Sequence, residues 1–173
     1  MKKEGIKSIV TLVVLITLII IGATIIANYV KKILIGAEEQ DLRTNMLLMQ
    51  AETKKGLEEV CFKIANLDES KEEDLAQINE IKNQYLKGKI LNESPEEVQE
   101  AVKNIQDFNF DENCYYLDQN TLNEIGIKKI TEEKYGYFIA KYDFSNANVE
   151  IISTKGYNEK HTLTQINEDI DNI

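Results

Sequence analysis

The sequence has little of the side-chain chemistry on which most enzymes depend. It contains a single histidine, His161, in a polar segment beside Lys160. That position lacks the neighbours which a histidine metal site or a Ser-His triad requires. P-loop, dinucleotide-binding, zinc-protease and serine-nucleophile motifs are all absent from the sequence. We therefore expect neither enzymatic activity nor a cofactor, and we interpret His161 as a solvated surface residue.

Basic residues are in the minority, 20 against 30 acidic ones, which gives a formal net charge of −10. Such a chain repels phosphate backbones, so we expect no nucleic-acid partner.

Asp111, Glu112 and Asp118 could approach one another around a short predicted strand, and calcium favours such oxygen ligands. Their spacing is not that of an EF-hand, so we interpret them as solvated loop acids and predict no metal site.

Charged residues are also missing from one long run, Ser8 to Val30. About 23 helical residues at roughly 1.5 Å each can cross a hydrocarbon core about 30 Å thick. The run is not amphipathic, which argues against a helix lying on the membrane surface. It exceeds the usual core of a secretory signal, and no small-residue cleavage site follows it. We predict a membrane anchor flanked by five lysines: Lys2, Lys3, Lys7, Lys31 and Lys32.

The first residues of the chain carry a family resemblance. Lys2 to Val14 reads KKEGIKSIVTLVV, and this start resembles the class III leader of type IV pilins and of type II secretion pseudopilins, in its clostridial versions. The resemblance implies that a prepilin peptidase cuts between Gly5 and Ile6 and methylates the new N-terminus. It also implies a cytoplasmic N-terminus, a single membrane pass and an extracellular C-terminal domain in the cell membrane.

Two residues depart from the family pattern. The fifth mature position usually holds a Glu that pairs with a neighbouring subunit's N-terminal amine, and here it is Val10. A carboxylate in the bilayer costs about 2.5–3.5 kcal/mol, so Val10 avoids that cost but loses the pairing. Lys7 at the second mature position is also atypical. These departures put a major-subunit role and normal processing in doubt more than membership of the family.

The helix is expected to continue past the membrane surface. Apolar residues recur there at steps of three and four, which predicts one buried stripe on an extended helix. Gly36 and Gly56 each lower helix propensity by about 1 kcal/mol relative to Ala, so bends are plausible there. The stripe consists of Leu42, Met46, Met49, Thr53, Leu57, Val60, Ile64 and Leu67.

Shorter elements follow the long helix. A capped helix is predicted from Ser70, with Glu73 completing the cap, to about Leu86. A second helix is predicted from Ser94-Pro95-Glu96-Glu97 to about Ile105. A third, short helix is predicted to be capped by Asp118 and to end at Gly126. Residues 135–142 and 148–153 predict an antiparallel hairpin, and 114–117 a third strand. The tail from Thr162 to Ile173 is predicted to form a short helix or to fray.

The expected fold is α+β: a long N-terminal transmembrane and stalk helix packed on a small antiparallel sheet with short helices, which is also the pilin design. We predict a leader (1–5), a transmembrane helix (6–32), an extended stalk helix (33–67) and an extracytoplasmic α+β domain (68–173).

The two cysteines of the sequence, Cys61 and Cys114, can be interpreted in two ways. They form a disulfide worth about 4 kcal/mol on the chain-entropy model, or they are two small buried hydrophobes.

The function predicted from these features is structural. The resemblance implies a pilin-like subunit that assembles through its N-terminal helix into an envelope-spanning filament or pseudopilus. Its partners would be the membrane, the prepilin peptidase, other pilin-like subunits and the assembly platform. Packing between helices in lipid depends on close contact, so the small residues Thr17, Gly22, Ala23 and Ala27 are the candidate subunit contacts. The alternative is a single-pass, membrane-anchored binding or sensing module that does not polymerise.

Overall fold

The computed structural model describes residues 2–105, 108–127 and 132–170. Within these ranges the side chains of residues 2–19, 21, 22, 29, 31–35, 132, 133, 169 and 170 are not described. The chain divides into two compact units, Met1–Gln40 and Asp41–Ile173. The second unit contains a five-stranded antiparallel sheet and several helices, which confirms the α+β fold class.

The longest element is helix α1, Lys2–Ile64, whose 63 residues continue through both Gly36 and Gly56. This confirms that the helix extends beyond the apolar run. In the second unit the predicted stripe is buried from Leu42 to Val60 and half-buried at Ile64, where α1 ends three residues before the predicted Leu67. Steps of three and four residues place these side chains on one face of α1, where they meet the rest of the unit.

No helix in the described part of the chain is long and apolar enough to span a membrane. The span predicted at residues 6–32 falls mostly on positions whose side chains are not described. It stays a prediction.

The other elements follow α1 in short steps. The helices are α2 (Glu72–Tyr85), the 3-10 turn η1 (Leu91–Glu93), α3 (Glu96–Lys103), α4 (Gln119–Glu124), α5 (Glu132–Tyr135) and α6 (Leu163–Ile170). The strands are β1 (Lys89–Ile90), β2 (Cys114–Leu117), β3 (Phe138–Asp143), β4 (Asn148–Tyr157) and β5 (Lys160–Thr162). The predicted hairpin and third strand are thus confirmed as β3, β4 and β2.

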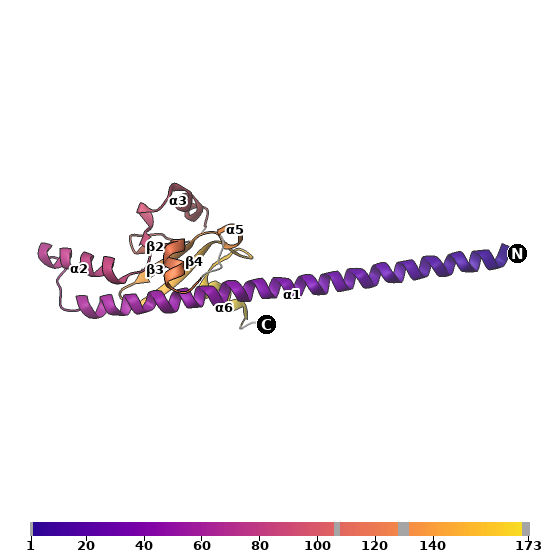
Figure 1. Cartoon of the computed structure of the whole chain (residues 1–173), viewed down its shortest axis with the longest axis horizontal. Coiled ribbons are helices and arrows are strands. Elements are labelled where there is room, and N and C mark those ends of the chain that lie inside the picture. Colours follow the sequence, from indigo (N-terminus) through magenta and orange to yellow (C-terminus); the bar gives the residue numbers. More distant parts are fainter. Residues whose placement is uncertain (1, 106–107, 128–131, 171–173) are drawn as a thin grey trace. The chain divides into compact units, whose positions relative to one another are not determined.

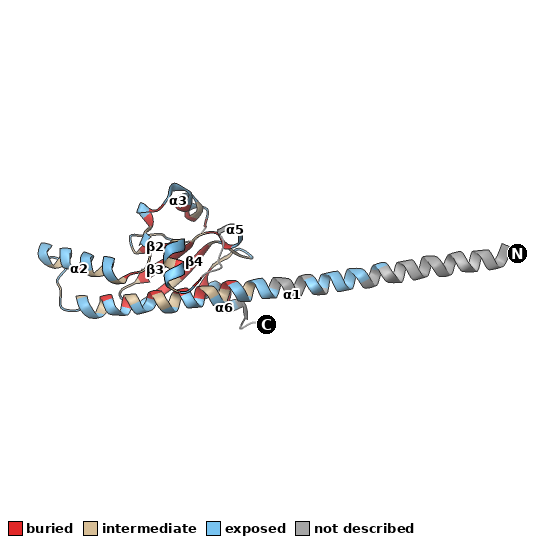
Figure 2. Ribbon diagram, viewed as in Figure 1, coloured by how far each residue is buried: buried red, intermediate tan, exposed pale blue. Residues whose placement is uncertain are grey.

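The sheet order is β1-β2-β3-β4-β5, so each strand pairs with its neighbour in the chain, always antiparallel. Figure 1 shows the sheet between the C-terminal part of α1 on one side and α3 on the other. Because successive side chains of a strand point to opposite faces, the sheet has two cores. Figure 2 shows the buried residues concentrated on the strands and on the adjacent turns of α1.

The larger core lies between the sheet and α1. It combines the buried stripe of α1 with alternate residues of the strands, among them Leu117, Phe138, Ala140 and Ile151. The smaller core lies on the opposite face and packs Val98 and Val102 of α3 against the remaining strand residues, which are Cys114, Tyr116, Ile139 and Ile152. Each fully buried aliphatic side chain contributes about 1.5–3 kcal/mol.

The predicted helix starts are right in position, but two of their caps are wrong. Ser70 donates to the Asp68 carboxylate instead of capping α2, whose N-cap is Lys71. Ser94 donates to the Leu91 carbonyl, which leaves Pro95 as the N-cap of α3. Asp118, in contrast, accepts the Thr121 N–H at 2.9 Å and caps α4 as predicted.

The two edge strands, β1 and β5, were not predicted from the sequence, and the C-terminal helix was predicted only as one of two alternatives. β1 and β5 have only two and three residues, too few to produce a readable pattern. The described part of the tail is helical, since α6 runs to Ile170. Its start is held by the Glu150 side chain of β4, which accepts hydrogen bonds from the Thr164 N–H and hydroxyl.

Candidate functional site

The surface of α1 is the first candidate site, because it carries large apolar side chains without cover. Ile25 and Ile26 are each 64% exposed, and Ile20 and Val30 are exposed as well. Among the described residues, those of α1 that join the cores begin at Leu42. Exposed aliphatic residues in such number on one helix mark a surface that meets another protein or a membrane.

The predicted processing and packing residues all lie on α1, but the structure describes only some of their side chains. Ala23 and Ala27 are exposed and stand one helical turn apart. Between them, the Thr24 hydroxyl donates to the Ile20 carbonyl at 2.8 Å, so it is satisfied within the helix. For Gly5, Ile6, Thr17 and Gly22 the structure describes only the helical backbone, and the same holds for Lys7 and Val10.

A second exposed face of α1 was missed by the sequence reasoning. In the C-terminal unit Leu47, Leu48 and Phe62 are exposed, and Phe62 reaches 80%. Phe62 also lines a surface hollow of about 510 Å³ together with Lys55, Glu58 and Glu59. The sequence carries no periodic signal for them, because the residues between Leu48 and Phe62 on that face are small or charged.

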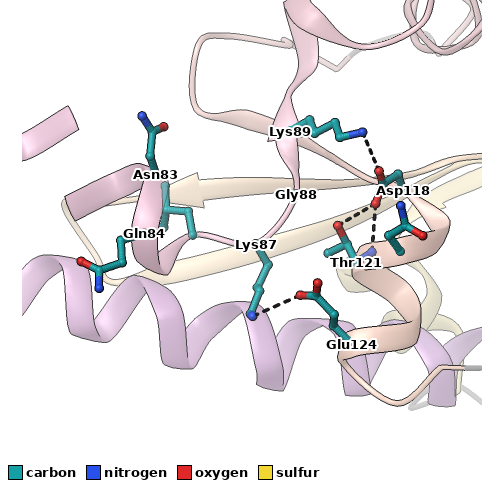
Figure 3. A pocket seen from close by; sticks show the side chains of 10 residues that line it. Asn83, Gln84, Lys87, Gly88, Lys89, Asp118, Thr121 and Glu124 are labelled. Atoms are coloured by element: carbon teal, nitrogen blue, oxygen red, sulfur yellow. Dashed lines mark hydrogen bonds and ion pairs between the residues drawn. The ribbon is translucent and has the colours of Figure 1, made fainter. Parts of the chain in front are cut away.

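A polar groove of about 330 Å³ lies between the C-terminal end of α2, the Lys87–Lys89 segment and α4. Figure 3 shows its charged side chains paired across it. The Lys87 ammonium lies 3.6 Å from the Glu124 carboxylate, and that of Lys89 lies 2.8 Å from Asp118. Because both lysines face a carboxylate, the groove presents no excess charge of either sign to a ligand.

The backbone beside this groove is fixed by two contacts. Gly88 has φ of +99°, and a Cβ there would lie 2.7 Å from the Tyr116 carbonyl oxygen. The Tyr142 hydroxyl donates to the Lys87 carbonyl at 2.9 Å and accepts the Lys87 N–H at 3.1 Å. These contacts hold the segment against the sheet, so we assign the groove a structural role.

Cys61 and Cys114 are both free in the structure. Cys61 is half-buried beside the larger core, whereas Cys114 belongs to the smaller core on the other face of the sheet. The structure has no disulfide between them, because the two cysteines belong to cores on opposite faces of the sheet. Burial raises the pKa of the Cys114 thiol to about 11 and also raises that of Cys61, and such thiols are poor nucleophiles at neutral pH.

The remaining candidate residues are engaged in the fold. Asp111 pairs with Lys141 at 3.1 Å and accepts the Asn113 N–H at 2.9 Å, so it is not gathered with Asp118 as a cation site would need. Groups of three metal-binding side chains are absent from the described residues.

His161 is half-buried, and its Nδ1 lies 3.0 Å from the Ser153 carbonyl oxygen. The prediction of a solvated surface residue is only partly right, because β5 brings His161 against β4.

Comparison of the chain with models of known protein families, with characterised proteins and with solved structures gives no match.

Proposed function

We propose that this chain is a pilin-like subunit, held in the cell membrane by its N-terminal helix and assembled through that helix into an envelope-spanning filament or pseudopilus. The observation that carries the proposal is the exposed apolar surface of α1 before Leu42, exemplified by Ile20, Ile25 and Ile26. The start of the sequence, with Gly5 before Ile6 and the long apolar run, supports the same function.

The architecture of the C-terminal unit agrees with this role. A pilin-like subunit needs a helix that carries a compact extracellular domain along its outer half, and here α1 buries the stripe from Leu42 to Val60 against the sheet. The proposed partners are the membrane, a prepilin peptidase, other pilin-like subunits and the assembly platform. The domain would be extracellular and the N-terminus of the precursor cytoplasmic.

The test is the intact mass and the N-terminal residue of the membrane-extracted chain, produced with and without a prepilin peptidase. We expect a mature chain that begins at methylated Ile6 only when the peptidase is present. Gly5→Val should block the cut, whereas Glu4→Gln, one residue away, should not. A chain that keeps Met1 to Gly5 in both samples would overturn the proposal and would leave an anchored binding or sensing module.

A further inference from the structure

Two short helices, α5 and α6, hold the first turn of α1 that docks on the domain. The Arg43 Nε donates to the side-chain oxygen of Asn167 on α6 at 2.6 Å. The Tyr135 hydroxyl of α5 donates to the Asp41 carboxylate at 2.7 Å. Asp41 and Arg43 lie about 100° to either side of Leu42 around the helix. The two short helices therefore contact α1 on both flanks of Leu42, a fully buried residue.

Both short helices also place apolar side chains in the larger core. Tyr135 is 4% exposed, and Leu163 and Ile166 of α6 are almost completely buried. All three belong to the same cluster as Leu42 and Met46 of α1. The first docked turn of α1 thus depends on α5 and α6 for apolar contacts as well as for hydrogen bonds. We call the residues that make these contacts the collar: Tyr135, Leu163, Ile166 and Asn167.

Further along α1 the domain holds the helix with other elements. The Gln50 side chain donates to the Val149 carbonyl of β4 at 2.7 Å, and Gly56 lies against the Tyr85 carbonyl at the end of α2. β4 has ten residues and α2 has fourteen, whereas α5 has four and α6 has eight. Isolated helices shorter than about 12–15 residues are marginal in water. The collar therefore keeps its structure only while it is docked.

Stability is not uniform within a folded domain, and elements with few contacts open more readily than the strands of a core sheet. α6 is joined to the sheet by β5, a strand of three residues, and by the Glu150 side chain that holds its start. Opening of the collar breaks the hydrogen bonds of Asp41 and Arg43 but leaves β2, β3 and β4 paired. It therefore costs less free energy than unfolding of the whole domain.

We infer that the collar opens as a unit and releases residues 41–49 of α1 while the rest of the domain stays folded. Release adds Leu42, Met46 and Met49 to the exposed apolar residues of α1. Under the proposed function α1 is the element through which subunits assemble, so the collar would control how much of its apolar surface another subunit reaches. That control rests on the proposed function, whereas the opening itself does not.

The test is hydrogen exchange of the backbone amides, measured by mass spectrometry on the full chain in mild detergent. In the parent chain the amides of residues 42–49 and of α6 should exchange several-fold faster than those of residues 53–60. Arg43→Ala and Tyr135→Phe should each accelerate exchange in residues 42–49 and in α6 several-fold and leave residues 53–60 unchanged. Both variants remove a hydrogen bond between α1 and the collar.

Two matched controls remove the same kinds of group elsewhere. Lys54→Ala shortens an exposed basic side chain of α1, and Tyr137→Phe removes a hydroxyl that makes an exposed 3.4 Å contact with Glu97. Neither should change exchange in residues 42–49 or in α6.

The inference would be overturned by equal acceleration in residues 53–60, by a response of residues 42–49 without α6, or by no response to either substitution. A variant that circular dichroism shows to be unfolded would overturn it too, because the collar would then not open on its own. Exchange is measured on the precursor as well as on any processed chain. Failure of the prepilin peptidase to cut after Gly5 therefore overturns the proposed function and leaves the collar untouched.

Discussion

Two glycines of α1 stand in different surroundings, although both interrupt a run of better helix formers. A Cβ at Gly56 would overlap the carbonyl oxygen of Tyr85, at the point where the end of α2 crosses α1. A Cβ at Gly36 would have no atom within 4 Å. Gly56 is therefore needed for helix packing, whereas Gly36 has no such constraint.

We expect Gly56→Ala to destabilise the domain by about 1–3 kcal/mol, because backbone must move to admit the methyl group. Gly36→Ala should leave the unfolding midpoint unchanged or raise it, since Ala favours a helix by about 1 kcal/mol over Gly. Urea unfolding followed by circular dichroism measures both. Equal midpoints for the two variants would contradict the assignment of the α2 contact to Gly56.

Tyr142 carries a hydroxyl that is both buried and fully used. Its ring is 1% exposed in the larger core, and its hydroxyl bridges the N–H and the carbonyl of Lys87. Burial raises the pKa of this phenol, so it stays neutral. Tyr142→Phe should cost about 1–3 kcal/mol, because both Lys87 groups lose a partner. Tyr137→Phe is the control, since its hydroxyl makes an exposed 3.4 Å contact with Glu97, and it should cost less in the same unfolding experiment.

At the scale of the element, the sheet keeps the two cysteines apart. Cys114 would reach the face of Cys61 only if β2 slipped by one residue, and that slip would turn every β2 side chain to the wrong core. We expect the intact mass under non-reducing conditions to show two free thiols. With iodoacetamide, Cys61 should react slowly in the folded chain and Cys114 only after unfolding. A mass two hydrogens lower, or equal labelling of both thiols, would contradict this separation.

The start of α4 gives the domain part of its acid sensitivity. Burial opposes ionisation of Asp118, but the Lys89 ammonium and the Thr121 N–H outweigh it, so the pKa of Asp118 lies below its ordinary value. Its carboxylate therefore stabilises the fold above about pH 4, the ordinary pKa of Asp. That contribution is lost as the pH falls through the folded pKa.

Asp118→Asn keeps an N-cap acceptor but removes the ion pair. We expect this variant to lose less stability than the parent between pH 5 and 2 (roughly the interval over which Asp carboxylates titrate), as measured by thermal melts. Glu112→Gln removes an exposed charge nearby and serves as the control. An unchanged pH dependence in Asp118→Asn would show that this carboxylate does not contribute.

The sequence predicts the elements better than their ends. The α1 stripe, the β3–β4 hairpin and the Asp118 cap each rest on a periodic or local signal that the fold keeps. Ser70 and Ser94 fail as caps because each finds a nearer acceptor, a competition that spacing does not reveal. The exposure of Leu48 and Phe62 on α1 was missed because the residues between them on that face, Ala51, Lys55 and Glu58, are small or charged and leave no apolar period to detect.

At the scale of the whole molecule, the proposed function would make assembly depend on the part of α1 before the domain. If Ala23 and Ala27 are subunit contacts, a bulky side chain there prevents close approach of neighbouring helices. We expect Ala27→Trp to reduce the fraction of chain in sedimentable assemblies several-fold. Asn28→Trp, the adjacent exposed position, should reduce it less. Equal effects would remove Ala27 from the contact.

The strand order of the sheet also sets when the protein can complete its fold. Each strand pairs with its predecessor in the chain, so the sheet can grow in the order in which the ribosome makes it. The α1 stripe is made first, yet its partners on β2, β3 and β4 come from Leu117, Phe138 and Ile151. Until synthesis passes Ile151, the sheet that buries Met46 and Met49 is incomplete. During that interval a nascent chain would expose the apolar stripe of α1, and exposed apolar surface of this kind makes an incomplete chain prone to aggregate.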